Sequence, residues 1–526
     1  MRDFHLPGRS PVFSTNGMCA TSHPLAAKVA IDILQSGGNA ADAAIAGAVL
    51  LGLCEPQMTG IGGDMFALIK PAGDERIVAL NGSGRAPAGL SGAALRAAGH
   101  DEMPLNTADP VTVPGAVDAF CQMSTDYGLK GLDAVLAPAI RYAEEGVPVA
   151  PRVAFDWHHH VAKLQGAAQA FYSIDGRAPA AGQVFRHAKQ AEVLRRIADQ
   201  GREGFYDGEI AEDMVASLRA LGGVHTLQDF AETACTYADP ISGDYKGTEL
   251  VEHPPNGQGA AAILLGNILA QFDLAAMDPV GADRAHIEAE ATKLAYDARN
   301  RFVADADHVT RLDHILDPAT AVRLAGLIDP ARAMPSPNPP TEAVHTDTIY
   351  ITVVDKDRMA VSLIYSIFKD FGCGLASSKF GILFHNRGAG FTLEDGHPNE
   401  ANPGKRPMHT IIPAMLRENG KVTMSFGVMG GQYQSTGHAR FVSNLVDFGL
   451  DPQAAIDAPR CFDEFGDMKV EKGYSDAVRQ DLADRGHKVV MPLNGIGGAQ
   501  AIRIDHDTGV LEGGSDPRKD GCALGY

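Results

Sequence analysis

The chain has 526 residues, with 45 Lys and Arg against 65 Asp and Glu, which gives a formal net charge of −20. Because 45% of the residues are hydrophobic, an intrinsically disordered chain is excluded and a large core is expected. The acidic balance argues against a nucleic-acid partner, which would need a basic surface.

The N-terminal segment and the cysteines bear on location and cofactors. No secretory apolar stretch opens the chain, and no run of about 18 apolar residues occurs, so we expect a cytoplasmic protein with no membrane partner. The seven cysteines are scattered and form no CxxC pair. This pattern is typical of buried free thiols rather than of disulfides or zinc ligands, and we expect neither a metal nor a cofactor.

Helical patterns dominate the first half of the chain. Apolar residues of 24–34 follow one helix face before a Gly-Gly-Asn stop, and residues 40–54 are apolar all round, which predicts a helix buried on every side. A strand is expected after the glycines of GIGGD, and another at 76–80. Further helices are predicted at 132–145, 190–198, 210–221, 260–272 and 283–302.

The second half reads differently. A proline-rich stretch at 333–341 cannot hold regular structure and predicts an exposed connector. After it, strands are predicted at 348–355, 360–366, 382–384, 410–416, 422–426 and 501–504, with helices at 437–448 and 475–485. A helix-rich half is therefore joined to a strand-rich half.

Glycine clusters occur at 60–64, 82–84 and 428–431, and none has the spacing of a phosphate-binding loop. Each could be only a tight turn. The VMGG cluster at 428–431 ends a predicted strand and precedes a predicted helix, so two successive backbone N–H groups could point into a cleft and hold an oxyanion.

Thr348 opens the strand-rich half. A threonine hydroxyl is a poor nucleophile without a nearby base, and a free α-amino group, with a pKa of about 7.7 to 8.0, is suited to that task. Such an amine exists only if the chain is cut before Thr348. Composition alone favours the simpler interpretation, a threonine that merely opens a β-strand.

Motifs along nearly the whole chain, in one order, resemble the gamma-glutamyltransferase family of N-terminal-nucleophile hydrolases. The matching segments are GGNAADAA, EPQMTGIGGD, RAPA, DPVTVPGAVDAF, PPNGQGAAAILL, DTIYITVVDKDRMAVSLIYS, FGCG, GILFHNRG, PGKRPMHTIIP, FGVMGGQYQ and GGSDPRKDGCALGY. The resemblance implies an α/β protein with a four-layer αββα sandwich. It also implies a proenzyme that cuts itself between Asp347 and Thr348 into a large subunit, 1–347, and a small subunit, 348–526, which together form one domain.

The resemblance further implies roles for four residues. Thr348 would be the nucleophile, with its own amine as the base. Gly430 and Gly431 match the oxyanion-hole glycines of the family. Ser366 stands where the family has a second threonine that hydrogen-bonds the nucleophile, so the hydroxyl is kept and the methyl group is lost.

Departures from the family pattern concern the substrate. Glutathione-cleaving members hold the glutamate α-carboxylate with an arginine and its α-amino group with an acidic residue. Here Arg387 and Gly390 occupy the positions where those enzymes carry Gln and Asp. The usual arginine position is Ser83, and Arg85 follows two residues later.

Two further substitutions change the expected pocket. Phe368 replaces an asparagine, and His409-Thr410 replaces paired serines. A glutamyl amino group would lack its acidic partner, while Arg387 and His409 add positive or donor character. The pattern is similar to the branch of the family with glutaryl-type acylases and an oxamate amidohydrolase.

The leading hypothesis is a self-processing amidase or acylase for a small amide whose acyl group carries a carboxylate. A true gamma-glutamyl hydrolase or transferase, with an amine clamp from elsewhere, is the first alternative, and an unprocessed non-catalytic chain is the second. The 392–405 segment is shorter than in members with a lid loop, which favours hydrolysis over transfer. A dimer of the processed protein is possible from the sequence.

Overall fold

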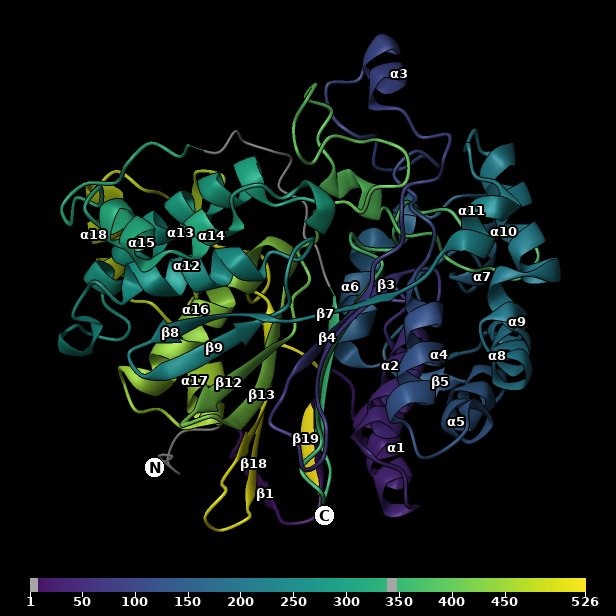
Figure 1. The fold of residues 1–526 in the computed structure, drawn as a ribbon, viewed down its shortest axis with the longest axis horizontal. Helices are drawn as coiled ribbons and strands as arrows, with labels where there is room; N and C mark the ends of the chain where they lie inside the picture. The colour runs from purple at the N-terminus through teal and green to yellow at the C-terminus, as the bar shows by residue number, and fades with distance from the viewer. Residues whose placement is uncertain (1–7, 338–347) are drawn as a thin grey trace.

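The computed structural model describes residues 8–337 and 348–526. Two seven-stranded sheets pack face to face, and helices cover the outer face of each (Figure 1). In the view of Figure 1, α12, α13 and α16 lie on the left, the sheets are central, and α1, α2 and α4 lie on the right. The expected four-layer αββα sandwich is confirmed.

One sheet has the order β1-β18-β17-β13-β12-β9-β8 and the other has the order β19-β2-β10-β11-β3-β4-β7. The strands of the first sheet are β1 (Val12–Ser14), β18 (Leu511–Ser515), β17 (Gly498–Ile504), β13 (Lys421–Met429), β12 (Ala414–Glu418), β9 (Thr248–Glu252) and β8 (Ile241–Tyr245). The strands of the second are β19 (Cys522–Gly525), β2 (Met18–Thr21), β10 (Ile349–Val354), β11 (Ala360–Ser366), β3 (Asp64–Lys70), β4 (Val78–Gly82) and β7 (Thr236–Ala238).

Smaller sheets join β14 (Cys461–Glu464), β15 (Asp467–Val470) and β16 (Lys488–Val490), and β5 (Val147–Pro148) with β6 (Val184–Phe185). The helices over the β10 sheet and behind them are α1 (Pro24–Gln35), α2 (Ala40–Cys54), α4 (Ala116–Tyr127), α5 (Leu132–Glu145) and α8 (Ala188–Gln200). Those over the β13 sheet and behind them are α12 (Gly259–Leu269), α13 (Ala282–Phe302), α15 (Pro318–Ala325), α16 (Gln434–Val446) and α17 (Pro452–Asp457).

Peripheral helices complete the chain. They are α3 (Gly92–Ala97), α6 (Pro151–His160), α7 (Gly166–Phe171), α9 (Glu203–Tyr206), α10 (Gly208–Ala220), α11 (Leu227–Glu232), α14 (Leu312–Leu316) and α18 (Asp476–Asp484). Among the described residues, no helix is both long and apolar enough to span a bilayer.

The surroundings of helix α2 explain why residues 40–54 are apolar on every side. All its residues are buried, and Asn39 and Asp42 form a capping box that satisfies its first backbone N–H groups. The helix packs on β10 and β11 while α5 covers its other side. A helix between a sheet and a second helix layer has no solvent face, which explains its uniformly apolar composition.

Strand β10 is buried on both faces for the same reason. Ile349, Ile351 and Val353 point into the core beneath the α1 and α2 layer. Tyr350 and Thr352 point toward the other sheet, where Thr352 Oγ1 lies 2.7 Å from Ser425 Oγ on β13. The alternation follows the two-residue period of a strand.

Several expectations about elements need correction. The strand predicted at 382–384 is wrong, because Leu383 forms only an isolated bridge with Ala376. The segment 116–302 is less helical than expected, since β7, β8 and β9 lie within it. The expected connector has no regular structure at 333–337, and its remainder, like Asp347, lies outside the described residues.

Candidate active site

The candidate nucleophile lies where several strand ends meet. Thr348 directly precedes β10 and is 1% exposed. In the antiparallel ladder Ile349 pairs with Tyr365, so Thr348 falls opposite Ser366, which in turn pairs with Asp64 at the start of β3. Thr348, Ser366 and Asp64 therefore form a row across three neighbouring strands.

Ser366 receives two hydrogen bonds on its hydroxyl oxygen. Thr348 Oγ1 donates to Ser366 Oγ at 3.2 Å, and the backbone N–H of Phe368 donates to the same oxygen at 2.8 Å. Because Ser366 is fully buried, these contacts fix the direction of the Thr348 hydroxyl.

The glycine pair lies at the end of β13, on the facing sheet. Gly430 has φ +118° and Gly431 has φ +53°, in the left-handed region that favours glycine. Contacts between β10 and β13 step in register: Thr352 meets Ser425, and a Cβ on Gly427 would lie 2.3 Å from the ring of Tyr350. If this register continues for two more residues, Thr348 is expected level with Met429, the last residue of β13 before Gly430.

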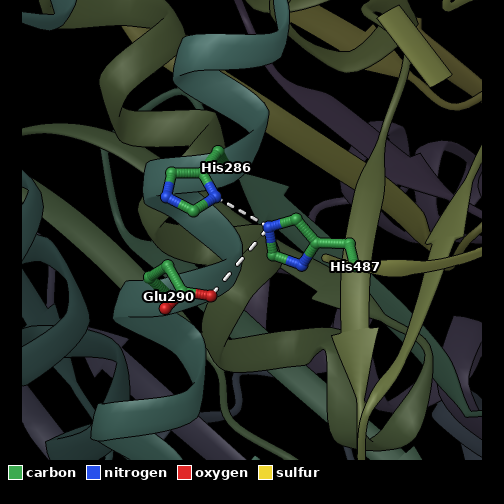
Figure 2. Close-up of side chains that lie close together, drawn as sticks. All are labelled: His286, Glu290 and His487. Atoms are coloured by element: carbon green, nitrogen blue, oxygen red, sulfur yellow. Dashed lines mark hydrogen bonds and ion pairs between the residues drawn. The ribbon is translucent and has the colours of Figure 1, made fainter. Parts of the chain in front are cut away.

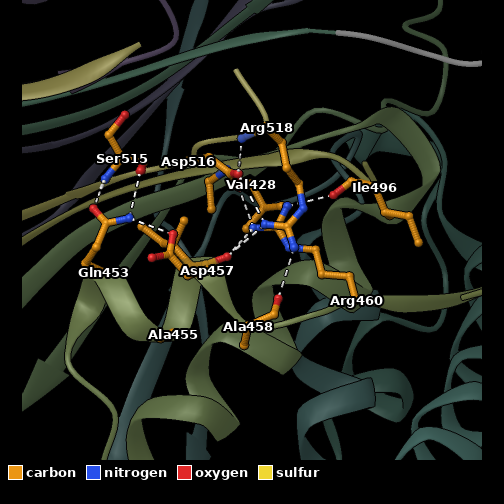
Figure 3. Close-up of polar contacts among 12 residues, drawn as sticks. Val428, Gln453, Ala455, Asp457, Ala458, Arg460, Ile496, Ser515, Asp516 and Arg518 are labelled. Carbon is orange, nitrogen blue, oxygen red and sulfur yellow. Dashed lines mark hydrogen bonds and ion pairs between the residues drawn. The ribbon is translucent and has the colours of Figure 1, made fainter. Parts of the chain in front are cut away.

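Gly497 packs closely against the glycine turn. A Cβ on Gly430 would lie 2.8 Å from Gly497 Cα, and one on Gly497 would lie 2.4 Å from the Met429 carbonyl oxygen. The residues around Gly497 are held by a charged network (Figure 3): Arg460 donates to the Ile496 carbonyl at 2.6 Å, and the Ala499 N–H donates to Asp516 at 2.7 Å.

Arg387 is fully buried beside this row of strands. Its guanidinium carbon lies 4.4 Å over the ring of Phe368, and its Nε is 3.8 Å from Asp64 Oδ2. None of its three nitrogens hydrogen-bonds to another described residue. Burial lowers the pKa of Arg387 to about 10, although Asp64 opposes that shift, so the group is charged at neutral pH with donors to spare.

His409 and Thr410 add two more unsatisfied polar groups. His409 Nε2 lies 2.7 Å from Ser83 Oγ, whereas His409 Nδ1 and Thr410 Oγ1 have no partner among the described residues. Burial, reinforced by Arg387, holds the pKa of His409 well below its usual value. His409 is therefore a neutral hydrogen-bonding group.

Asp64 was not singled out by sequence reasoning as a site residue. Its Oδ1 accepts hydrogen bonds from the N–H groups of Gly84 and Gly115, at 3.0 and 3.3 Å. Its Oδ2 lies 3.2 Å from His385 Nδ1 and 3.5 Å from His409 Nε2, yet forms no hydrogen bond with a described residue. The available signal was a charged residue opening an otherwise apolar strand.

Arg85 is placed away from this cluster. Its side chain is 41% exposed, and Nη1 lies 3.2 Å from Asp305 Oδ2 and 2.9 Å from the Gly404 carbonyl oxygen. The structure thus brings together Arg387, Phe368, His409 and Thr410, but not Arg85.

A cavity of about 640 Å³ borders the cluster. Phe368, Gly390, Met408 and Gln432 are among the residues that line it. Gly390 leaves this wall uncharged at the position where a family acid was expected.

Three buried side chains of the types that bind metals lie close together in the described part of the chain: His286, Glu290 and His487 (Figure 2). The two rings already share a hydrogen bond, with His286 Nδ1 2.7 Å from His487 Nε2, while Lys293 Nζ lies 2.7 Å from Glu290 Oε1. An ammonium group on the carboxylate oxygen that faces the histidines fits a cation poorly. The cluster instead holds the 329–334 segment, through His286 to the Asp329 carbonyl and through Met334 N–H to Glu290.

Known proteins resemble this chain over nearly its whole length. The family profile described as Gamma-glutamyltranspeptidase matches residues 26–526. The chain is 35% identical to the Glutathione hydrolase-like YwrD proenzyme of Bacillus subtilis, over 98% of this chain and 99% of that protein. It is 33% identical to the Oxamate amidohydrolase proenzyme of Klebsiella pneumoniae, with the same coverage of 98% and 99%.

A solved structure is also similar over the full length. The crystal structure of cephalosporin acylase from Bacillus halodurans superposes with a TM-score of 0.93 at 39% identity, covering 100% of this chain and 99% of that one. The chain belongs to the gamma-glutamyltranspeptidase family of hydrolase and acyltransferase enzymes.

Proposed function

We propose that the chain cuts itself before Thr348 and then hydrolyses the amide bond of a small acyl group that carries a carboxylate. The new α-amino group takes the Thr348 hydroxyl proton as Oγ1 attacks the amide carbonyl. The N–H groups of Gly430 and Gly431 hold the oxyanion. Collapse breaks the C–N bond, the ammonium protonates the leaving amine, and water then hydrolyses the Thr348 ester.

The observation that carries this proposal is the buried Arg387 guanidinium, which has an ion-pair contact with Asp64 but no hydrogen bond to a described residue. Buried polar groups are nearly always hydrogen-bonded, and a buried charge whose N–H donors stay unsatisfied is costly. A substrate carboxylate can accept two of its N–H bonds at once. The Phe368 ring that it covers is uncharged and His409 is neutral, so neither competes with Arg387 for a carboxylate.

Strand spacing suggests the length of the acyl group. Neighbouring strands lie about 4.8 Å apart, so Thr348 and Asp64, two strands apart, are separated by about 10 Å. Arg387 lies beside Asp64. This separation suits a chain of several carbons, such as glutaryl, better than the two-carbon oxamate unit. The names of two relatives, an amidohydrolase and an acylase, support the reaction class.

A gamma-glutamyl substrate is the second candidate, and Asp64 is the observation that favours it. Its Oδ2 is buried without a hydrogen bond among the described residues. It could accept the ammonium group that Gly390 cannot. The relative described as glutathione hydrolase-like supports this alternative.

A panel of p-nitroanilides tests both candidates on processed enzyme. Glutaryl, gamma-glutamyl and uncharged butyryl compounds should rank in that order of kcat/KM. Arg387→Met should raise KM for glutaryl by about tenfold to a hundredfold, since a charged hydrogen bond is lost, and should leave the poor butyryl substrate unchanged. Asp64→Asn should lower turnover of the gamma-glutamyl compound selectively if the second candidate is right.

Failure of the proposal has clear signatures. Equal turnover of butyryl and glutaryl compounds would remove the role of Arg387, and an intact chain on denaturing electrophoresis would favour a non-catalytic protein.

A further inference from the structure

Arg299 of α13 is a buried cation near the glycine turn. It is 1% exposed, and its guanidinium lies 4.0 Å over the ring of Tyr296. Its hydrogen bonds to described residues all go to amide oxygens: Gln258 Oε1 at 2.7 Å, Gln432 Oε1 at 2.7 Å, and Asn300 Oδ1 at 3.0 and 2.8 Å. Burial lowers the pKa of Arg299 to about 10, which leaves it charged at neutral pH.

The guanidinium determines how the Gln258 amide is turned. Arginine can only donate hydrogen bonds, so the oxygen of Gln258 must face Arg299 and its NH₂ group must face the other way. On that side Nε2 donates to the Thr410 carbonyl at 2.6 Å and to the Gly431 carbonyl at 3.3 Å. Gln258 is fully buried, so no water competes for these carbonyl groups.

The residue after the glycine pair is held from the same helix. Arg299 donates to the Gln432 side chain, and the Tyr296 hydroxyl donates to the Gln432 carbonyl oxygen. Tyr296 and Arg299, on neighbouring turns of α13, thus hold Gln432, while Gln258 holds the Gly431 carbonyl. Glycines with positive φ have no side chains of their own to restrict them, so the direction of the turn depends on such contacts.

We propose that Arg299 is a positioning residue for the oxyanion turn. Through Gln258 and Gln432 it holds the chain directly after the glycine pair, at the Gly431 carbonyl and at Gln432, and its charge polarises the Gln258 amide toward Gly431. Preorganised donors act because they need no rearrangement when charge develops. The inference rests on the proposed function, since it assigns the turn to an oxyanion.

A competing role is substrate binding, because Arg299 also borders the cavity. The two roles predict different kinetics. A group that binds the ground state changes KM, whereas one that orients oxyanion donors changes kcat.

The test compares Arg299→Met, Gln258→Ala and the double variant, using kcat per N-terminal threonine, KM for the best anilide, and Tm. Losing one oxyanion donor costs about a hundredfold to a thousandfold in kcat, so losing its support should cost about tenfold to a hundredfold, with KM within about threefold. Because both residues act in one chain of contacts, the double variant should be within about threefold of the slower single variant. Arg299→Lys keeps the charge without the planar fork and should recover kcat only in part.

Arg284→Met is the matched control. Arg284 lies on the same helix, is 1% exposed, and covers the ring of Phe448 at 4.4 Å, but it contacts Glu288, Ser443 and Asn444. It should lower Tm at least as much as Arg299→Met while changing kcat less than about twofold.

Three results would overturn the inference: a raised KM at unchanged kcat, single effects that multiply in the double variant, or equal kcat losses in the Arg284 and Arg299 variants. If a variant cuts itself too slowly for kcat to be measured, its rate of self-cutting is compared with that of the wild-type chain, provided that its Tm is unchanged. A wild-type chain that neither cuts nor turns over any anilide would instead remove the proposed function itself.

Discussion

Thr348 depends on neighbours from other elements for any reactivity. Its hydroxyl is directed by Ser366, and Ser366 is itself fixed by the Phe368 N–H. Phe368 has φ +75°, a conformation that costs a non-glycine residue energy and persists where the surroundings impose it. That backbone brings its N–H to Ser366 and its ring under Arg387.

At this scale we expect Thr348→Ala to block both self-cutting and turnover, because one hydroxyl serves both reactions. Thr348→Ser should retain both at reduced rates. Denaturing electrophoresis and an anilide assay measure the two effects. Thr352→Val, which alters a threonine on the same face of the same strand, is the control and should still be cut. A Thr348→Ala chain that splits normally would refute the assignment.

Among the elements, β13 and the C-terminal segment are coupled through the network of Figure 3. Asp516 Oδ2 accepts a hydrogen bond from Arg460 Nη2 at 2.5 Å, and Asp516 Oδ1 accepts one from Arg518 Nη1 at 3.2 Å. Burial alone would raise the pKa of Asp516, but the two arginines outweigh it and lower the value. The network holds the 496–499 segment under Gly430, so it joins the chain terminus to the glycine turn.

We therefore expect Asp516→Ala to destabilise the protein by about 3 to 5 kcal/mol, since it leaves buried arginine charge uncompensated. Urea unfolding measures the loss. Asp457→Ala is the control from the same network. The Asp457 carboxylate lies at the edge of the network and accepts a hydrogen bond from Gln453, so its removal should lower the free energy of unfolding by only about 1 kcal/mol. Similar losses in both variants would argue against a special role for Asp516.

The whole molecule is held together across the proposed cut. In one sheet β10 and β11 lie between β2 and β3, and in the other β12 pairs with β9. Both sheets thus contain strands from 1–347 that are hydrogen-bonded to strands from 348–526. Cutting before Thr348 would leave these hydrogen-bond ladders intact, and we propose that the two subunits remain one domain.

Buried histidines make stability of the whole molecule depend on pH. Burial lowers the pKa of His23, His187 and His253 to about 4. Below about pH 6.5 the unfolded chain takes up protons that the folded chain refuses, so stability falls with acidification, by about 1.4 kcal/mol per pH unit for each histidine. Glu55, whose pKa burial raises to about 7, has the opposite sign and offsets about one of them.

We expect the urea midpoint to fall steadily between pH 6.5 and 4.5. His187→Asn removes one titrating group while keeping an N-cap acceptor for Gln190 N–H, and should flatten the slope. A midpoint that stays constant or rises on acidification would contradict this account.

Sequence patterns predicted elements where local periodicity and burial agree. The helix at 40–54 and the strand at 360–366 match α2 and β11 residue for residue. The predicted strand, glycine turn and helix around 428–431 correspond to β13, Gly430 and Gly431, and α16. Short strands such as β2 and β19 were missed, because four residues carry little periodic signal and their pairing is long-range.

The candidate site was readable only in part. The order of motifs indicated the family, and the substitutions at Phe368, Arg387 and His409 indicated a changed pocket. Asp64 escaped notice because its role comes from facing His385 and His409 across more than 300 positions of sequence. Arg85 is the opposite case: the sequence made it a candidate substrate-binding residue, but its side chain pairs with Asp305 instead.

The sequence by itself determined the family, the main elements and the residue types available for chemistry, because these depend on local patterns and on motifs that survive in order. Which polar groups share a pocket, and which are left without partners, was decided only by the tertiary structure. The physical reason is that side-chain direction and burial come from strand pairing and sheet packing between distant segments, and those contacts leave the Arg387 guanidinium without a hydrogen-bond acceptor among the described residues.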